Sequence, residues 1–235
     1  MLFRSRGELL SWDVTNSRIS REFEVRPIVG EHHIALSADD TILVTSGTRP
    51  QFFNSQTGEE LAIMDRFTQA VTGLATIPDG DRILSAYDDG YLRLWSSESR
   101  NLINVLEPEF TSAGDIAIPS SGEFSAVKFF SEIIVYDREA QTERLRINGG
   151  RTGLTDLDVA QDGKFIAAGN FDGVTFIWDA KSGDQIHQLT GHTSTVQGVA
   201  YAPNGELLAT AGADGAVIVW DPMSGEEVIR LEENV

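Results

Sequence analysis

One aromatic side chain returns along this chain at a nearly constant interval of 41 or 42 residues. The six positions are Trp12, Phe53, Trp95, Tyr136, Trp178 and Trp220. Four of them are followed directly by Asp, as in Trp220-Asp221. A fixed period of this length indicates a repeat architecture, in which one small unit cannot bury its own faces and stacks on copies of itself. We expect such a chain to present a surface rather than to carry out a reaction.

The last repeat shows the internal pattern most clearly. Short apolar and β-branched runs occupy residues 196–201, 207–211, 217–220 and 227–231. Turn residues separate these runs, including Asp214-Gly215 and Ser224-Gly225, so the runs are predicted to be strands. A repeat of about 40–45 residues that contains four short strands is typical of a β-propeller blade. We therefore predict an all-β fold, a β-propeller of four-stranded antiparallel blades.

The predicted repeats fall into a single propeller domain covering residues 1–235. Their approximate bounds are 1–25, 26–66, 67–108, 109–149, 150–190 and 191–235. Aligning Trp12 with Trp95 puts Met1 inside the second strand of a blade, so the first blade is predicted to be incomplete. We expect a fragment of a seven-bladed ring, whose closure needs upstream sequence or another chain. The alternative is a six-bladed ring with a three-stranded first blade.

Several motifs make the chain resemble the WD-repeat β-propeller family. They are Gly191-His192, Pro203-Asn204-Gly205, Asp214-Gly215 and Trp220-Asp221. The resemblance implies that His192, Thr210, Asp214 and Trp220 form a structural hydrogen-bonded tetrad within one blade. Other repeats depart from this pattern: the Trp95 repeat lacks the His, and the Trp178 repeat has Ala168 at the hydroxyl position. We therefore expect blades of uneven stability.

The net charge of the chain limits the classes of partner that we expect. The formal charge is −18 with a pI near 4.5, and a field of that sign repels phosphate backbones and anionic lipids. We expect neither nucleic acid nor a membrane as a partner. The chain has no Cys, which excludes disulfides and thiolate chemistry. Charges interrupt any apolar core in residues 1–6, so no signal peptide is predicted and we expect a cytoplasmic protein.

Arginine and aromatic residues are predicted to gather on one rim of the propeller, because loops between repeats and loops between second and third strands share that rim. The candidate residues are Arg6, Arg26, Arg49, Arg66, Tyr87, Phe110, Arg151 and Phe171. These residue types are enriched in binding hot spots. The family resemblance implies the same rim as a peptide-docking surface. Alternatively, the aromatic residues belong to the blade core and the arginines balance local acids.

Asp156 and Asp158 stand out on a predicted innermost strand, where other repeats mostly have small or apolar residues. A buried carboxylate needs a partner, for which Arg151 or channel water is favoured over a bound cation. His32 and His33 are adjacent and face opposite sides of a strand, so they cannot jointly hold a metal. No phosphate-binding loop is present, and we expect no catalytic residue, cofactor or metal.

The leading hypothesis is a non-catalytic interaction scaffold that binds a protein or peptide on the arginine and aromatic rim, as part of a larger polypeptide or complex. One rival is an enzyme, or a small-ligand or cation site, in the central channel near Asp156 and Asp158. A second rival is a sensory or regulatory module attached to an enzymatic domain outside this chain. The mostly apolar innermost strands weigh against catalysis.

Overall fold

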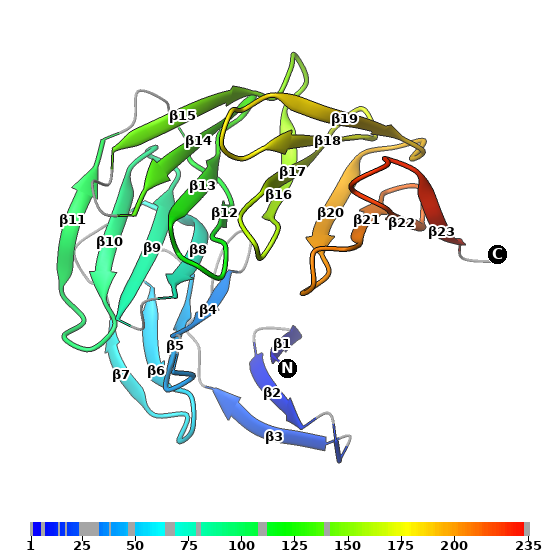
Figure 1. Ribbon diagram of the computed structural model, residues 1–235. Coiled ribbons are helices and arrows are strands. Elements are labelled where there is room, and N and C mark those ends of the chain that lie inside the picture. The colour runs from blue at the N-terminus through cyan, green and yellow to red at the C-terminus, as the bar shows by residue number, and fades with distance from the viewer. Residues whose placement is uncertain are drawn as a thin grey trace. The chain divides into compact units, whose positions relative to one another are not determined.

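The computed structural model describes residues 2–5, 8–13, 15–16, 18–23, 33–37, 39–46, 50–63, 69–78, 81–107, 112–138 and 142–232. The chain divides into two compact units, the N-terminal unit Met1–Thr111 and the C-terminal unit Ser112–Val235. Every regular element in these described ranges is a β-strand (Figure 1). Over the same residues, nothing forms a helix long and apolar enough to span a membrane.

The N-terminal unit contains three antiparallel sheets. The first has three strands: β1 (Leu2–Ser5), β2 (Glu8–Asp13) and β3 (Arg18–Phe23). The second has four: β4 (Ile34–Leu36), β5 (Ile42–Thr45), β6 (Gln51–Asn54) and β7 (Glu60–Ile63). The third also has four: β8 (Val71–Ile77), β9 (Arg82–Tyr87), β10 (Leu92–Ser96) and β11 (Leu102–Leu106).

The C-terminal unit contains three four-stranded sheets, each a meander in sequence order. The first is β12 (Ile116–Ala117), β13 (Phe124–Lys128), β14 (Glu132–Asp137) and β15 (Glu143–Asn148). The second is β16 (Leu154–Val159), β17 (Phe165–Asn170), β18 (Val174–Asp179) and β19 (Gln185–Thr190). The third is β20 (Val196–Tyr201), β21 (Leu208–Gly212), β22 (Ala216–Trp220) and β23 (Glu227–Glu232).

The recurring aromatic has the same place in every sheet. It lies on the strand next to the outermost one, at a β-bulge where two residues of the outermost strand oppose it, as Trp95, Trp178 and Trp220 show. The first, second and fourth sheets have the same irregularity at Trp12, Phe53 and Tyr136. Because a bulge increases the local twist of a strand, its repetition gives all six sheets a common form.

Neighbouring sheets within the C-terminal unit share apolar cores. Ile177 and Leu189 of one sheet pack with Val196, Leu208 and Trp220 of the next, and all five side chains are buried. Large apolar side chains therefore fill the space between the two sheets. Together with the strand order, this confirms the predicted fold class: an all-β chain of antiparallel propeller-type sheets with a three-stranded first sheet. Assignment of all six sheets to one domain stays a prediction.

One turn position shows how the backbone selects its residue. Gly122, Gly163 and Gly205, in the turns between first and second strands, adopt φ of 63°, 72° and 72°. Asp40 occupies the matching position of the second sheet and adopts φ of 58°. Asp tolerates this left-handed region better than most residues do, so the turn keeps its form without glycine.

Candidate functional site

Four side chains of the last sheet form a continuous hydrogen-bonded chain. Trp220 Nε1 donates to Thr210 Oγ1 at 2.9 Å, and His192 Nε2 lies 2.9 Å from the same hydroxyl oxygen. At the other side of the imidazole, His192 Nδ1 lies 3.0 Å from Asp214 Oδ1. The tetrad that the family resemblance implies therefore has hydrogen-bonding geometry, and it links β21, β22 and the loop before β20.

Asp214 anchors this chain as an ionised group. Burial raises its pKa, but the N–H groups of Thr193 and Ala216, at 2.8 and 3.1 Å, and the His192 imidazole donate to the carboxylate and lower the pKa to about 2. Because an ionised carboxylate only accepts hydrogen bonds, His192 Nδ1 carries the proton. Gly212 is required beside this pair, since a Cβ there would lie 2.3 Å from both His192 Nδ1 and Asp214 Oδ1.

A hydroxyl, an imidazole and a carboxylate in series are also the components of a nucleophilic triad. Here the hydroxyl cannot act as a nucleophile. Thr210 is only 1% exposed, and its Oγ1 both accepts from Trp220 Nε1 and lies 3.4 Å from the Ile218 carbonyl oxygen. A substrate has no access to this oxygen, so the network holds strands together rather than supporting catalysis.

The third sheet keeps half of this network and replaces the rest. Trp95 Nε1 donates to Ser85 Oγ at 2.8 Å, as in the last sheet. Asp89, however, pairs with Arg93, whose Nη2 lies 2.8 Å from its Oδ2. The Arg93 guanidinium is buried and stacks 4.0 Å from the centre of the Tyr87 ring. Arg93 therefore pairs with the loop aspartate, as His192 does in the last sheet, and the sequence pattern alone did not predict this pair.

Asp156 and Asp158 act as acceptors for a neighbouring edge strand. Asp156 Oδ2 accepts the N–H of Val199 at 2.7 Å, and Asp158 Oδ2 accepts the N–H of Tyr201 at 2.7 Å. The partner predicted for Asp158 was Arg151 or channel water; the protein group that donates to Asp158 Oδ2 is the Tyr201 N–H. Burial raises the pKa of both carboxyls, and the N–H donors only partly oppose this. The pair bridges β16 and β20.

Lys128 makes a related bridge between β13 and β16. Its Nζ lies 3.3 Å from Asp115 Oδ2 and donates to the carbonyl oxygens of Leu154 and Thr155, at 3.4 and 3.0 Å. Thr155 Oγ1 in turn donates to the Val196 carbonyl at 2.5 Å. Sequence analysis missed this set, although a Lys in a chain with only three of them was a usable signal.

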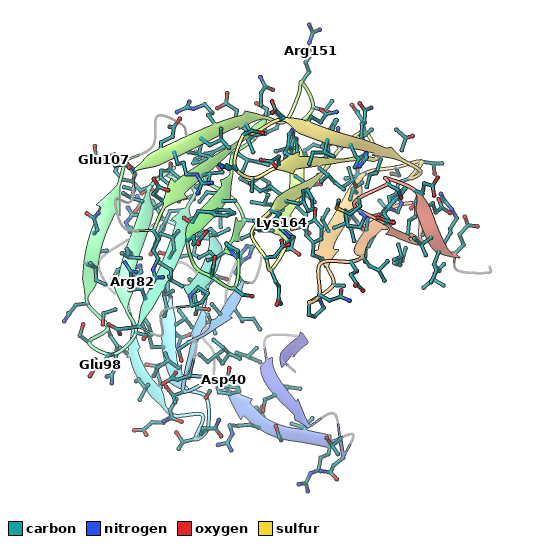
Figure 2. All side chains as sticks on the ribbon, viewed as in Figure 1. Asp40, Arg82, Glu98, Glu107, Arg151 and Lys164 are labelled. Carbon is teal, nitrogen blue, oxygen red and sulfur yellow. The ribbon has the colours of Figure 1, made fainter. Side chains whose placement is uncertain are left out.

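Of the predicted rim residues, Arg151 and Phe171 are exposed on one edge of the C-terminal unit, where Figure 2 shows Arg151 extending into solvent. Phe171 is 55% exposed and Phe130 beside it is 68% exposed. Both rings lie against Gly153, where a Cβ would approach Phe130 Cε2 to 2.7 Å and Phe171 Cε2 to 3.0 Å. We call Phe130, Arg151, Gly153 and Phe171 the aromatic edge.

The other rim predictions have different outcomes. Tyr87 is completely buried beneath Arg93 and offers no contact surface, so its ring belongs to the core of its sheet. The remaining predicted positions lie outside the described residues: Arg6, Arg26, Arg49, Arg66 and Phe110. Within the described part of the chain, no group of three or more His, Cys, Asp or Glu is arranged to hold a metal ion.

Comparison with protein families finds a match to the WD domain, G-beta repeat model at residues 58–96, 142–179 and 183–221. These three segments contain three of the recurring aromatic residues, Trp95, Trp178 and Trp220. The third segment also contains the complete tetrad of the last sheet.

Curated relatives resemble the chain at moderate identity. Pre-mRNA-processing factor 19 of Mus musculus is 24% identical over 61% of this chain and 29% of its own length. Meiotic recombination protein rec14 of Schizosaccharomyces pombe is 24% identical over 81% of this chain and 52% of its own length. The guanine nucleotide-binding protein subunit beta-1 of Homarus americanus is 26% identical over 50% of this chain and 36% of its own length. The matched region thus spans about half or less of each of these relatives.

Proposed function

Because the chain is a WD-repeat protein, we propose that it is a non-catalytic scaffold that binds a protein or peptide through the aromatic edge of its C-terminal unit. Proteins of this family generally act as protein-interaction scaffolds rather than as enzymes. The hydroxyl of the Thr210, His192 and Asp214 series is buried in the last sheet, which supports the non-catalytic part of the proposal.

The observation that carries the proposal is the paired exposure of Phe130 and Phe171. Two large aromatic rings lie side by side over Gly153, and more than half of each side chain is open to solvent. Exposed aromatic pairs are unfavourable in water, and aromatic residues dominate the energetics of protein interfaces. Arg151, from the same loop as Gly153, adds a charged group at the margin of these rings. A partner that covers the rings removes apolar surface from water.

The test is a displayed peptide library selected on the full chain, followed by affinity measurements on the Phe130→Ser/Phe171→Ser double variant. We expect the selected peptides to bind this variant at least about ten-fold more weakly, as loss of paired hot-spot residues predicts. Met223→Ser removes a comparably exposed apolar side chain (69%) from another loop and should leave affinity unchanged. Selected peptides that bind the double variant as well as the original chain, or a library that yields none, would refute the proposal.

A further inference from the structure

A second surface of the C-terminal unit differs in charge from the rest of the chain. A cavity of about 570 Å³ lies between the sheet β12–β15 and the sheet β16–β19. Its lining residues are Glu123, Phe124, Arg144, Gly163, Lys164, Phe165, Asp179 and Lys181. Two of the three lysines in the chain thus meet at one cavity, although the chain carries a net charge of −18. It is separate from the aromatic edge, whose residues come from other loops.

The cations of the cavity have weak or incomplete local partners. Lys164 pairs with Asp162 at 2.8 Å, but both side chains are largely exposed, so the pair contributes little and exchanges readily (Figure 2). Lys181 forms no ion pair with the described residues, although its charge contributes to lowering the pKa of Asp179. The Asp179 carboxylate is mainly occupied by the N–H groups of Lys181 and Ser182, at 2.9 and 2.8 Å.

Arg144 and two phenylalanines supply the rest of the surface. The Arg144 guanidinium lies 5.3 Å from the centre of the Phe124 ring and donates to the Ala180 carbonyl at 3.3 Å. Its nearest carboxylate oxygen, on Asp137, is 3.8 Å away, which is a loose contact. The partly buried Phe165 gives the cavity an apolar wall, and Phe124, which is only 2% exposed, lies behind this wall in the core. The cavity therefore combines three cations and two carboxylates, those of Glu123 and Asp179, with aromatic surface.

The repeat itself provides an internal comparison for this site. One period later in the chain, the residues that correspond to Arg144, Lys164 and Lys181 are an apolar, an acidic and an apolar residue. These are Ile186, Glu206 and Met223. The three cations are therefore not required by the propeller-type sheet, since the next sheet forms without them.

We propose that this cavity binds an acidic peptide segment in which an apolar side chain is flanked by carboxylates. The apolar side chain packs on Phe165, and the carboxylates pair with Lys164, Lys181 and Arg144. Charge complementarity selects this occupant: a basic segment would meet the cations of the cavity, whereas most of the remaining surface of this chain attracts it. The site is independent of the proposed function at the aromatic edge.

The test uses three short blocked peptides, acetyl-Glu-Phe-Glu-amide, acetyl-Gln-Phe-Gln-amide and acetyl-Lys-Phe-Lys-amide, titrated into the full isotope-labelled chain. Binding is followed by NMR shifts of the Gly163 and Lys181 amides. We expect the acidic peptide to bind most tightly and the basic peptide most weakly. Raising the salt concentration should weaken binding of the acidic peptide, because the contacting charges are exposed.

Variants separate local charge from net charge. The Lys164→Gln/Lys181→Gln double variant should bind the acidic peptide about five-fold more weakly, in line with the loss of two exposed ion pairs. Arg151→Glu changes the net charge by the same amount on the aromatic edge and should leave this affinity unchanged. Three results would overturn the proposal: no shifts with the acidic peptide, equal binding of the acidic and basic peptides, or equal weakening by the two variants. Loss of library peptides at the aromatic edge has no bearing on this outcome.

Discussion

Replacing Asp158 by Ala should destabilise the C-terminal unit by removing an acceptor from an edge strand. Asp158 Oδ2 accepts the Tyr201 N–H at 2.7 Å, and β20 has a backbone partner only on its other side, at β21. A buried N–H left without an acceptor costs about 1–3 kcal/mol. For a chain of this size that corresponds to a decrease of roughly 3–10 °C in Tm. Urea unfolding followed by tryptophan fluorescence measures the change.

The Asp158→Asn variant keeps a side-chain oxygen that can accept the Tyr201 N–H but removes the carboxylate charge. The amide oxygen can accept the same N–H, so this variant should be much less destabilised than Asp158→Ala. Burial raises the carboxyl pKa above its usual value of 3.8 in the folded protein, despite the opposing N–H bonds. A raised pKa means that the folded state binds the proton more tightly. The contribution of Asp158 to stability is therefore complete below pH 3.8 and declines as the pH rises through the folded pKa.

The stability of Asp158→Asn relative to the original chain should consequently increase between about pH 4 and pH 7, because the amide does not titrate. Asp184→Ala is the matched control, since Asp184 is exposed on a turn of the same unit. The reasoning is refuted if Asp158→Ala unfolds at the same urea concentration as the original chain. It is also refuted if Asn and Ala are equally destabilising at every pH.

Two further predictions concern the tetrad of the last sheet. Thr210→Val removes the oxygen that accepts from Trp220 Nε1 and should lower the free energy of unfolding by about 1–3 kcal/mol, whereas Thr210→Ser should lower it less; thermal unfolding distinguishes them. Asp214 has a folded pKa of about 2 against a usual value of 3.8, so its stabilising effect is complete above pH 3.8 and is lost as the pH falls through 2. The stability advantage of the original chain over Asp214→Asn should therefore shrink between pH 4 and pH 2, and a constant difference in acid titrations would contradict this.

The periodic features of the fold could be predicted from the sequence because each one repeats. The spacing of Trp95, Trp178 and Trp220 gave the repeat length, and the turn signals between short apolar runs gave four strands per sheet. The position of Trp12, only eleven residues after Met1, predicted a first sheet of three strands, and the first sheet has three. A repeat averages over many residues, so a departure at one position does not hide the pattern.

Features that occur once could not be predicted in the same way. Asp158 was recognised as unusual, but its acceptor role depends on the register between β16 and β20, which no local pattern encodes. Arg93 was missed because an arginine within an apolar strand has no fixed partner until Asp89 and Tyr87 are placed in space. Tyr87 shows the opposite error, since a loop-end aromatic in the sequence is a core residue in the structure.

The side-chain hydrogen bonds that occur in only one repeat satisfy backbone groups that every sheet leaves unpaired at its edge. The innermost strands β12, β16 and β20 are sheet edges, so each leaves backbone groups without a ladder partner. Lys128 donates to free carbonyls of β16, and Asp156 and Asp158 accept free N–H groups of β20, so donor and acceptor side chains match the groups they meet. These bridges reach the sheet β16–β19, in which Ala168 has the register position that Thr210 has in the last sheet and supplies no hydroxyl for Trp178. A repeat can therefore lose its tetrad while its neighbours keep the strands in register, which accounts for sheets of one form built from unequal sequences.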